Sequence, residues 1–234
     1  MDSRYVDEQF VQQYAGLWCY GAEVVNVGCT EGFYNTVVGA AIHLQSNPRV
    51  VIEQGCGIGR VSYELARAMP SAHVIGIDDS ATMIKWANKL HKGTPGETVP
   101  LDLTACGFGH RTIMATCLPN LDFQVSDCME PWQEPVDLIV SVNLFDRLAQ
   151  PTEYISQCFE GLAPGGTIIM TTPLNWRDPH GWQQFPDEQS VLDTFQIHGF
   201  SIRKSMMGLI YREMLDARGN FSEFSSLLVI ADKL

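Results

Sequence analysis

Positive charge is scarce in this sequence of 234 residues, where 15 lysines and arginines stand against 27 aspartates and glutamates. The formal net charge is −12, and no basic run is longer than Arg203-Lys204. Most of such a surface would repel a phosphate backbone or an anionic membrane. We therefore expect no nucleic acid and no membrane as partners. A cationic or zwitterionic substrate is easier to reconcile with this charge.

Long apolar runs are also missing, because the longest ones, such as residues 137–144, have the length of a strand and are too short to cross a bilayer. The N-terminal segment is acidic and polar, unlike a signal peptide. The 7 cysteines are scattered and form no Cys-x-x-Cys pair, which is typical of reduced thiols. These absences favour a cytoplasmic protein.

Signatures of metal sites and nucleophiles are sparse as well. The segment Cys106-Gly-Phe-Gly-His110 offers two ligands, too few for a zinc site. The sequence contains no Gly-x-Ser-x-Gly elbow, the turn that presents a catalytic serine. We expect neither a bound metal nor a nucleophilic triad.

The chain does contain a regular alternation of strand-like and helix-like segments, in a globular composition that is 45% hydrophobic and 18% charged. Helices are expected at 61–68, 80–87, 152–162 and 189–198. Strands are expected at 50–52, 73–77, 121–125, 136–142, 167–171, 200–205 and 227–231. This order predicts an α/β fold with a Rossmann-like, seven-stranded, mostly parallel sheet and helices on both faces.

We expect a single domain over residues 1–234, because no repeat, low-complexity tract or linker divides the sequence. Two segments fall outside the alternation. Residues 1–48 form an N-terminal helical extension, with helices expected at 7–17 and 36–45. Residues 93–120 form an insertion that carries Gly, Pro and Thr. Such additions often form lids and substrate walls.

A glycine-rich turn, Glu53-Gln54-Gly55-Cys56-Gly57-Ile58-Gly59, follows the first expected strand. Glycine is needed where a backbone turns sharply or comes close to a ligand, and ligands of open α/β sheets bind at the carboxyl ends of the strands. Asp78 ends the next strand, where a carboxylate can accept both ribose hydroxyls of an adenosine. The turn therefore predicts a site for a nucleoside cofactor.

The type of cofactor follows from the residues around the glycines. A dinucleotide site requires Gly-x-Gly-x-x-Gly, but Arg60 stands where the last glycine should be. Glu53 would repel a pyrophosphate, whereas it suits a ligand with an ammonium group and a sulfonium. The turn therefore favours S-adenosylmethionine over NAD.

The same turn resembles motif I of class I S-adenosylmethionine-dependent methyltransferases. Asp78 matches the ribose-binding acid of that family, Asp127-Cys128-Met129 its adenine-binding stretch, and residues 162–166 the turn before its fifth strand. The resemblance implies the class I fold, an enzyme, and a small-molecule acceptor. The cofactor-binding residues that it implies are Glu53, Gly55, Cys56, Gly57, Gly59, Asp78, Asp79, Met83, Asp127, Cys128, Met129 and Asn143.

A narrower resemblance concerns the acceptor. The segment Asn143-Leu-Phe-Asp146-Arg147-Leu-Ala-Gln-Pro151 is similar to the Asn-Leu-x-Asp-Arg-Leu-x-x-Pro stretch of the mercaptohistidine N-methyltransferase domain of ovothiol biosynthesis. Cys19-Tyr20-Gly21 stands where that family has His-Tyr-Gly. The resemblance implies N-methylation of an imidazole or amine acceptor, such as a histidine derivative.

Candidate acceptor residues come from these segments and from the end of the chain. For catalysis we consider Asn143, Asp146 and Tyr20, and for substrate binding Tyr20, Arg147, Trp176, Tyr211 and Arg212. Each has a structural alternative: Asn143 could cap a strand, Asp146 and Arg147 could pair locally, and the aromatic residues could be core. Arg212 could form an exposed pair of no consequence.

Two other functions stay open. A natural-product O- or S-methyltransferase would have a more apolar pocket, with a histidine or lysine base beside Asn143. A non-catalytic methyltransferase-like binding protein would have lost part of the cofactor site, yet Glu53, the three glycines and Asp78 are intact. A homodimer is compatible with the sequence.

Overall fold

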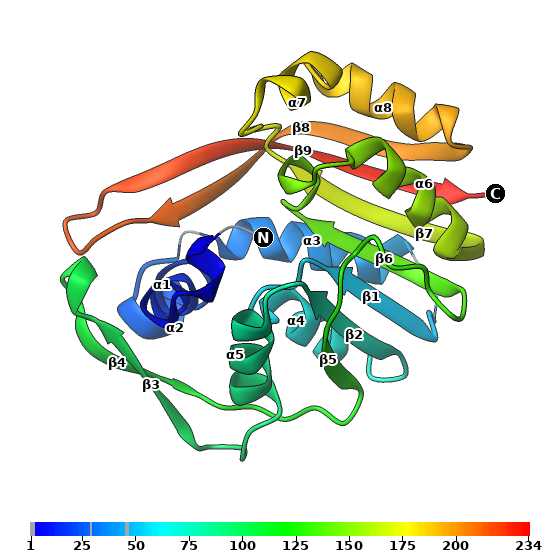
Figure 1. The fold of residues 1–234 in the computed structure, drawn as a ribbon. Helices are drawn as coiled ribbons and strands as arrows, with labels where there is room; N and C mark the ends of the chain where they lie inside the picture. The colour runs from blue at the N-terminus through cyan, green and yellow to red at the C-terminus, as the bar shows by residue number, and fades with distance from the viewer. Residues whose placement is uncertain (1–2, 29, 45–46) are drawn as a thin grey trace.

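A seven-stranded sheet organises the computed structural model, which describes residues 3–28, 30–44 and 47–234 (Figure 1). Its strand order is β5-β2-β1-β6-β7-β9-β8. The strands are β1 (Val50–Gln54), β2 (His73–Asp78), β5 (Leu121–Val125), β6 (Val136–Val142), β7 (Leu162–Thr172), β8 (Phe200–Met214) and β9 (Phe221–Lys233). The first five in this order are parallel neighbours, whereas β9 runs antiparallel to β7 and β8. The predicted sheet is confirmed.

Helices cover both faces of the sheet, because its central strands are apolar on both sides. On one face, α3 (Glu31–Leu44) and α4 (Arg60–Ala68) pack on residues such as Val51 and Leu138. On the other, α6 (Pro151–Gly161) and α8 (Glu188–Ile197) pack on residues such as Ile52 and Ile139. Two shorter helices, α7 (Pro179–Gln184) and the 3₁₀ turn η4 (Phe145–Arg147), follow β7 and β6.

The last two strands are much longer than the predicted 200–205 and 227–231. Their pairing continues from Phe200↔Lys233 to Met214↔Phe221, and the hairpin projects well beyond the sheet (Figure 1). Its outer part buries single side chains such as Tyr211 and Met214 among polar and exposed residues, so no regular apolar alternation reveals this extension in the sequence. A smaller correction concerns α6, which begins at Pro151 rather than behind a Thr152 cap, because proline suits the first helical position.

The insertion at 93–120 forms a separate two-stranded sheet of β3 (Thr98–Leu103) and β4 (Gly109–Met114), joined by the 3₁₀ turn η3 (Thr104–Cys106). It reaches the tip of the long hairpin, where the Ala217 amide donates to the Cys106 carbonyl at 2.9 Å. Buried Leu101 and Leu103 pack against Gly16 of the N-terminal segment.

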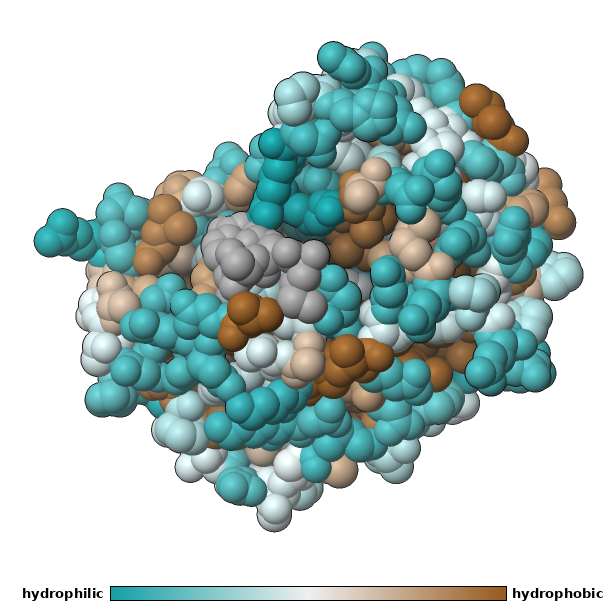
Figure 2. Space-filling model, viewed as in Figure 1, coloured by the Kyte–Doolittle hydropathy of each residue, from teal (hydrophilic) through white to brown (hydrophobic). Residues whose placement is uncertain are grey.

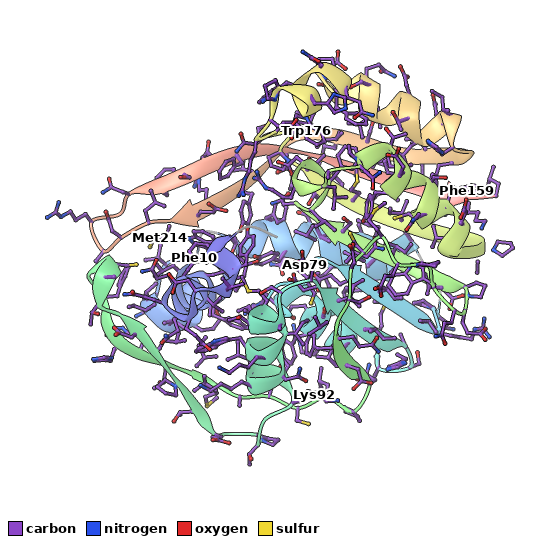
Figure 3. The ribbon with its side chains drawn as sticks, viewed as in Figure 1. Phe10, Asp79, Lys92, Phe159, Trp176 and Met214 are labelled. Carbon is purple, nitrogen blue, oxygen red and sulfur yellow. The ribbon has the colours of Figure 1, made fainter. Side chains whose placement is uncertain are left out.

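The N-terminal segment consists of η1 (Ser3–Val6), α1 (Glu8–Gln13), a π-helix η2 (Tyr14–Cys19) and α2 (Gly21–Val25). The helix expected at 7–17 therefore changes its winding after Gln13. The helix expected at 36–45 begins earlier, at Glu31, and Gln45 lies outside the described residues. The segment packs on α5 (Ala81–His91) and on the long hairpin, where the Trp18 indole donates to the Met214 carbonyl at 2.7 Å. Phe10 and Met214, both labelled in Figure 3, belong to the apolar cluster that this packing forms.

No helix in the described ranges has both the length and the apolar character that a membrane span requires.

Candidate active site

A cavity of about 400 Å³ lies at the carboxyl ends of β1, β2, β5, β6 and β7. Figure 2 shows this face hollowed near its middle, with hydrophilic and hydrophobic residues at the rim. Figure 3 places Asp79, one of the lining residues, at the centre of the molecule beside α5. The N-terminal segment and the outer part of the β8–β9 hairpin supply the remaining walls. The cavity therefore occupies the position at which open α/β sheets bind ligands.

The glycine turn forms the floor of the cavity through Gly55, Cys56 and Gly57. Gly55 and Gly57 have φ values of 68° and 54°, a left-handed conformation that favours glycine. A Cβ atom on Gly57 would lie 3.0 Å from the Tyr14 hydroxyl oxygen. Gly59 does not line the cavity, because the ring of Phe123 lies where its Cβ would be, at 2.4 Å. Its left-handed conformation instead starts α4.

Asp78 fixes the turn and faces the cavity. Its Oδ2 accepts from the Gly57 amide and its Oδ1 from the Ser80 amide, both at 2.9 Å. Burial raises the pKa of Asp78 to about 6, although the two amide hydrogen bonds oppose this rise. A carboxylate held in this way is preorganised to accept further hydrogen bonds from a ligand.

Glu53 is buried at the base of the turn and also lines the cavity. Its carboxylate accepts hydrogen bonds from the Ser62 amide at 2.6 Å and from the Ser62 hydroxyl. Burial raises its pKa to about 8. Glu53 therefore holds the first turn of α4 against the glycine turn.

The remaining expected cofactor residues divide between cavity and core. Asp79, Met83, Asp127, Cys128 and Asn143 line the cavity. Met129 does not, because it packs on the core beneath α6, while its amide donates to Asp127 at 2.9 Å. A glycine floor with acids at the ends of successive strands suits a ligand that combines an adenosine, a sulfonium and an ammonium group. The residues present therefore fit S-adenosylmethionine.

Asn143 closes β6 in a left-handed conformation with a φ of 51°. Its amide donates to the Thr171 carbonyl at 2.9 Å, and its side-chain oxygen accepts from the Thr171 hydroxyl at 3.1 Å. Asn143 therefore caps the end of the strand, which is the structural role considered for it, and it also lines the cavity.

Asp146 and Arg147 separate in the structure. The Asp146 side chain is fully buried and lies outside the cavity, where it accepts from the Asn175 amide at 3.0 Å. Arg147 lines the cavity, donates to the Asn175 carbonyl at 3.1 Å and lies 3.5 Å from Asp146. Burial raises the pKa of Asp146. The expectation that Asp146 contacts substrate is therefore corrected: it anchors the loop that carries Arg147.

Three further expected residues also lie away from the cavity. Tyr20 bonds to His91 Nε2 at 2.9 Å and stacks beneath Arg60. Trp176 belongs to the core, where its ring stacks on Phe185 with centroids 5.5 Å apart. Arg212 is exposed and pairs with Glu223 at 2.6 Å. Of the expected acceptor residues, Tyr211, Arg147 and Asn143 line the cavity.

Several residues that line the cavity were not among the expected site residues. The π-helix contributes Tyr14, Trp18 and Cys19, and other elements contribute Tyr5, Tyr34, Arg60, Arg177, Glu213 and Phe224. The Cys19 sulfur lies 3.9 Å from the Tyr34 hydroxyl, and burial raises the pKa of Cys19 to about 12. Burial also raises the pKa values of Tyr14, Tyr34 and Tyr211 well above their ordinary value. Cys19 and these three tyrosines are therefore uncharged at physiological pH.

No group of three or more His, Cys, Asp or Glu side chains in the described part of the chain is arranged to hold a metal ion.

Comparisons with known proteins agree with this geometry. A family model described as a methyltransferase domain matches residues 22–205. Trans-aconitate 2-methyltransferase of Streptomyces coelicolor is 29% identical over 138 residues, which cover 58% of this chain and 38% of that protein. Malonyl-[acyl-carrier protein] O-methyltransferase of Halalkalibacterium halodurans is 24% identical over 133 residues, covering 55% and 40%.

Among solved structures, the N-methyltransferase NodS of Bradyrhizobium japonicum in complex with S-adenosyl-L-homocysteine is 14% identical, with a TM-score of 0.59 and coverage of 98% of this chain and 94% of that chain. The [4+2]-cyclase SpnF shows a TM-score of 0.57 at 14% identity, with coverage of 86% and 79%. At such identities the likeness concerns the fold.

The fold and the cavity define a class I S-adenosylmethionine-dependent methyltransferase. The chain belongs to the methyltransferase domain family, and its cofactor is S-adenosylmethionine. It spans less than half the length of the curated relatives described above.

Proposed function

We propose that this protein transfers the methyl group of S-adenosylmethionine to a nitrogen atom of a small, amino-acid-like acceptor, an imidazole or amine such as a histidine derivative. The observation that carries this proposal is the mixed charge of the cavity away from the glycine turn. Arg147 and Arg177 suit a carboxylate, whereas Glu213 and Tyr211 suit an ammonium or an imidazole N–H. We treat residues 1–234 as one methyltransferase domain, with 1–48 and 93–120 as additions.

The chemistry places a modest demand on the chain. When bound, S-adenosylmethionine supplies a methyl group on a sulfonium, already activated for transfer. The protein must then hold the acceptor nitrogen in line with that methyl, roughly 3 Å away, and positioning supplies much of the acceleration. A neutral imidazole nitrogen has a free lone pair and needs only orientation and the right tautomer. No histidine or lysine is among the described residues that line the cavity, which favours an acceptor that needs no base.

A second candidate is O-methylation of a carboxylate. The cavity contains two arginines, and curated relatives are named trans-aconitate 2-methyltransferase. A carboxylate oxygen is ionised at neutral pH and also needs no base. The natural-product O- or S-methyltransferase is less well supported, since the base expected beside Asn143 is missing from the described lining.

A product screen by mass spectrometry separates these candidates. The protein is incubated with S-adenosylmethionine and, in separate reactions, histidine, thiol-histidines, histamine, trans-aconitate and a phenol. The proposal predicts a gain of one methyl on an imidazole or amine, and Asp78→Ala serves as the control without cofactor. Methylation of trans-aconitate alone would favour the second candidate. Methylation of the phenol alone would contradict both.

A further inference from the structure

Aromatic side chains from three distant parts of the chain meet in the cavity. The π-helix η2 contributes Tyr14 and Trp18, α3 contributes Tyr34, and the long hairpin contributes Tyr211 and Phe224. We call these five residues the aromatic wall. Tyr14 and Phe224 are only partly buried, so their rings offer surface to a ligand in the cavity.

The rings of the aromatic wall are held in place by one another. Tyr14 and Trp18 pack edge to face with centroids 5.3 Å apart, and the Trp18 indole N–H already donates to the Met214 carbonyl. Tyr211 and Phe224 are cross-strand partners in the hairpin, with centroids 6.3 Å apart. The wall is therefore preorganised, and Trp18 offers a ligand its ring rather than its N–H.

In the part of the chain that the structure describes, no cationic side chain lies over a ring of the aromatic wall. The arginines and lysines that do stack on rings lie over Tyr20, Trp86, Phe159 and Phe221. The negative face of an aromatic ring attracts a cation within about 6 Å of its centroid. The wall is therefore available to a cation that a ligand brings.

A carboxylate beside the aromatic wall strengthens this attraction. Glu213 lies two residues after Tyr211 on β8, which places both on the same face of the strand, and it also lines the cavity. Burial and, after it, the charge of Glu213 raise the pKa of Tyr211. The negative charge therefore acts on the wall, where it favours a cationic ligand.

The kind of cation follows from the chemistry of the rings. A primary ammonium has three N–H donors, each of which needs an acceptor. Ring faces instead suit a nitrogen whose hydrogens are replaced by methyl groups, as in the recognition of quaternary ammonium ligands by aromatic side chains. The aromatic wall therefore fits a methylated ammonium better than a primary one.

We propose that the aromatic wall binds a methylated ammonium group of the acceptor and thereby selects acceptors of this chemical class. This inference rests on the proposed function, because it assumes an acceptor that carries a cationic nitrogen. It gives the N-terminal segment and the outer part of the hairpin a role in the choice of substrate.

The test measures binding by isothermal titration calorimetry to the full chain saturated with S-adenosylhomocysteine, so that no methyl transfer occurs. Three small probes are compared. They are choline, ethanolamine, which carries a primary ammonium, and the neutral analogue of choline in which a tert-butyl group replaces the trimethylammonium group. We expect choline to bind roughly 5–30-fold more tightly than either of the other two.

Variants separate the rings from other sources of this preference. Phe224→Leu removes a ring but keeps an apolar side chain, and it should lower the preference for choline over its neutral analogue by roughly 2–5-fold. Phe221→Leu is the matched control, because it makes the same change in the same strand at an exposed ring outside the cavity. It should keep the preference of the unmodified protein. Tyr34→Phe retains the ring and loses only the hydroxyl, so it should keep the preference as well.

Several outcomes would overturn the assignment. It is wrong if choline fails to bind, if either other probe binds as tightly, if Phe224→Leu keeps the full preference, or if Tyr34→Phe loses it. It is also wrong if choline displaces S-adenosylhomocysteine, because the cation would then occupy the cofactor side. A product screen without N-methylation would instead refute the proposed function and leave the choline result unaffected. Thermal melting verifies that each variant is folded.

Discussion

The two sides of the cavity are built in different ways. The cofactor side is centred on one continuous turn, of which Glu53, Gly55, Cys56 and Gly57 line the cavity, together with Asp78 one strand later. The acceptor side gathers single residues from distant elements: Tyr34 from α3, Arg147 after β6, Arg177 after β7, and Tyr211 from the long hairpin. A site made from one local segment has a recognisable spacing, whereas a site made by convergence has none. The donor could therefore be identified from the sequence, and the acceptor could not.

The largest expected effect tests the cofactor side. Asp78→Ala removes the carboxylate that fixes Gly57 and Ser80 and that can accept both ribose hydroxyls. We expect the dissociation constant for S-adenosylhomocysteine to rise roughly 100–1,000-fold, measured by calorimetry. Asp122→Asn, which removes an acid outside the cavity at the start of β5, should leave it unchanged. An unaltered affinity in Asp78→Ala would mean that the ribose site is misplaced.

The second prediction concerns the stability of the same turn. The pKa of Glu53 is about 8 in the folded protein and 4.5 ordinarily, so between these values the folded state binds more protons than the unfolded state. Its contribution is fully present below pH 4.5 and is lost as the pH rises through 8. We expect the free energy of unfolding to fall by roughly 2–5 kcal/mol between pH 5 and pH 8 through this group.

Urea denaturation at several pH values measures this fall, and Glu53→Gln, which stays neutral, should flatten it. Asp78 acts in the same direction over a lower window, because burial raises its pKa from 3.8 to about 6. An equally steep fall in Glu53→Gln would show that other groups cause it.

The sheet and the turn could be predicted because their signals are local. Val50 to Ile52 are β-branched, and the glycines follow directly. The length of the β8–β9 hairpin could not be predicted, since its outer part buries only single side chains, such as Tyr211 and Met214, among polar and exposed residues. Tyr20 was expected in the site, but Tyr14 lines the cavity instead, and the two residues begin and directly follow a π-helix. Propensity gives no sign of such a change in winding.

The third prediction addresses the acceptor side. Arg147→Met should raise the KM for a carboxylate-bearing acceptor about 10-fold, as expected for the loss of one charge-assisted hydrogen bond, with little change in cofactor affinity. Asp146→Ala should do the same through displacement of the loop that Asn175 and Arg147 share. Histamine, which lacks a carboxylate, provides the control acceptor, and its KM should stay the same in both variants. An equal rise for histamine would indicate a general distortion.

The smallest expected effect concerns Tyr20, which lies outside the cavity, in comparison with Tyr211, which lines it. Tyr20→Phe removes the hydroxyl that bonds to buried His91 at 2.9 Å, outside the cavity, and keeps the ring beneath Arg60. The free energy of unfolding should fall by about 1 kcal/mol, while the kcat and the KM for the acceptor stay the same. Tyr211→Phe, the matched change at a residue that lines the cavity, should alter the KM instead. If Tyr20→Phe lowers kcat at unchanged stability, Tyr20 contributes to the reaction although it lies outside the cavity. The description of Tyr20 as a purely structural residue would then be wrong.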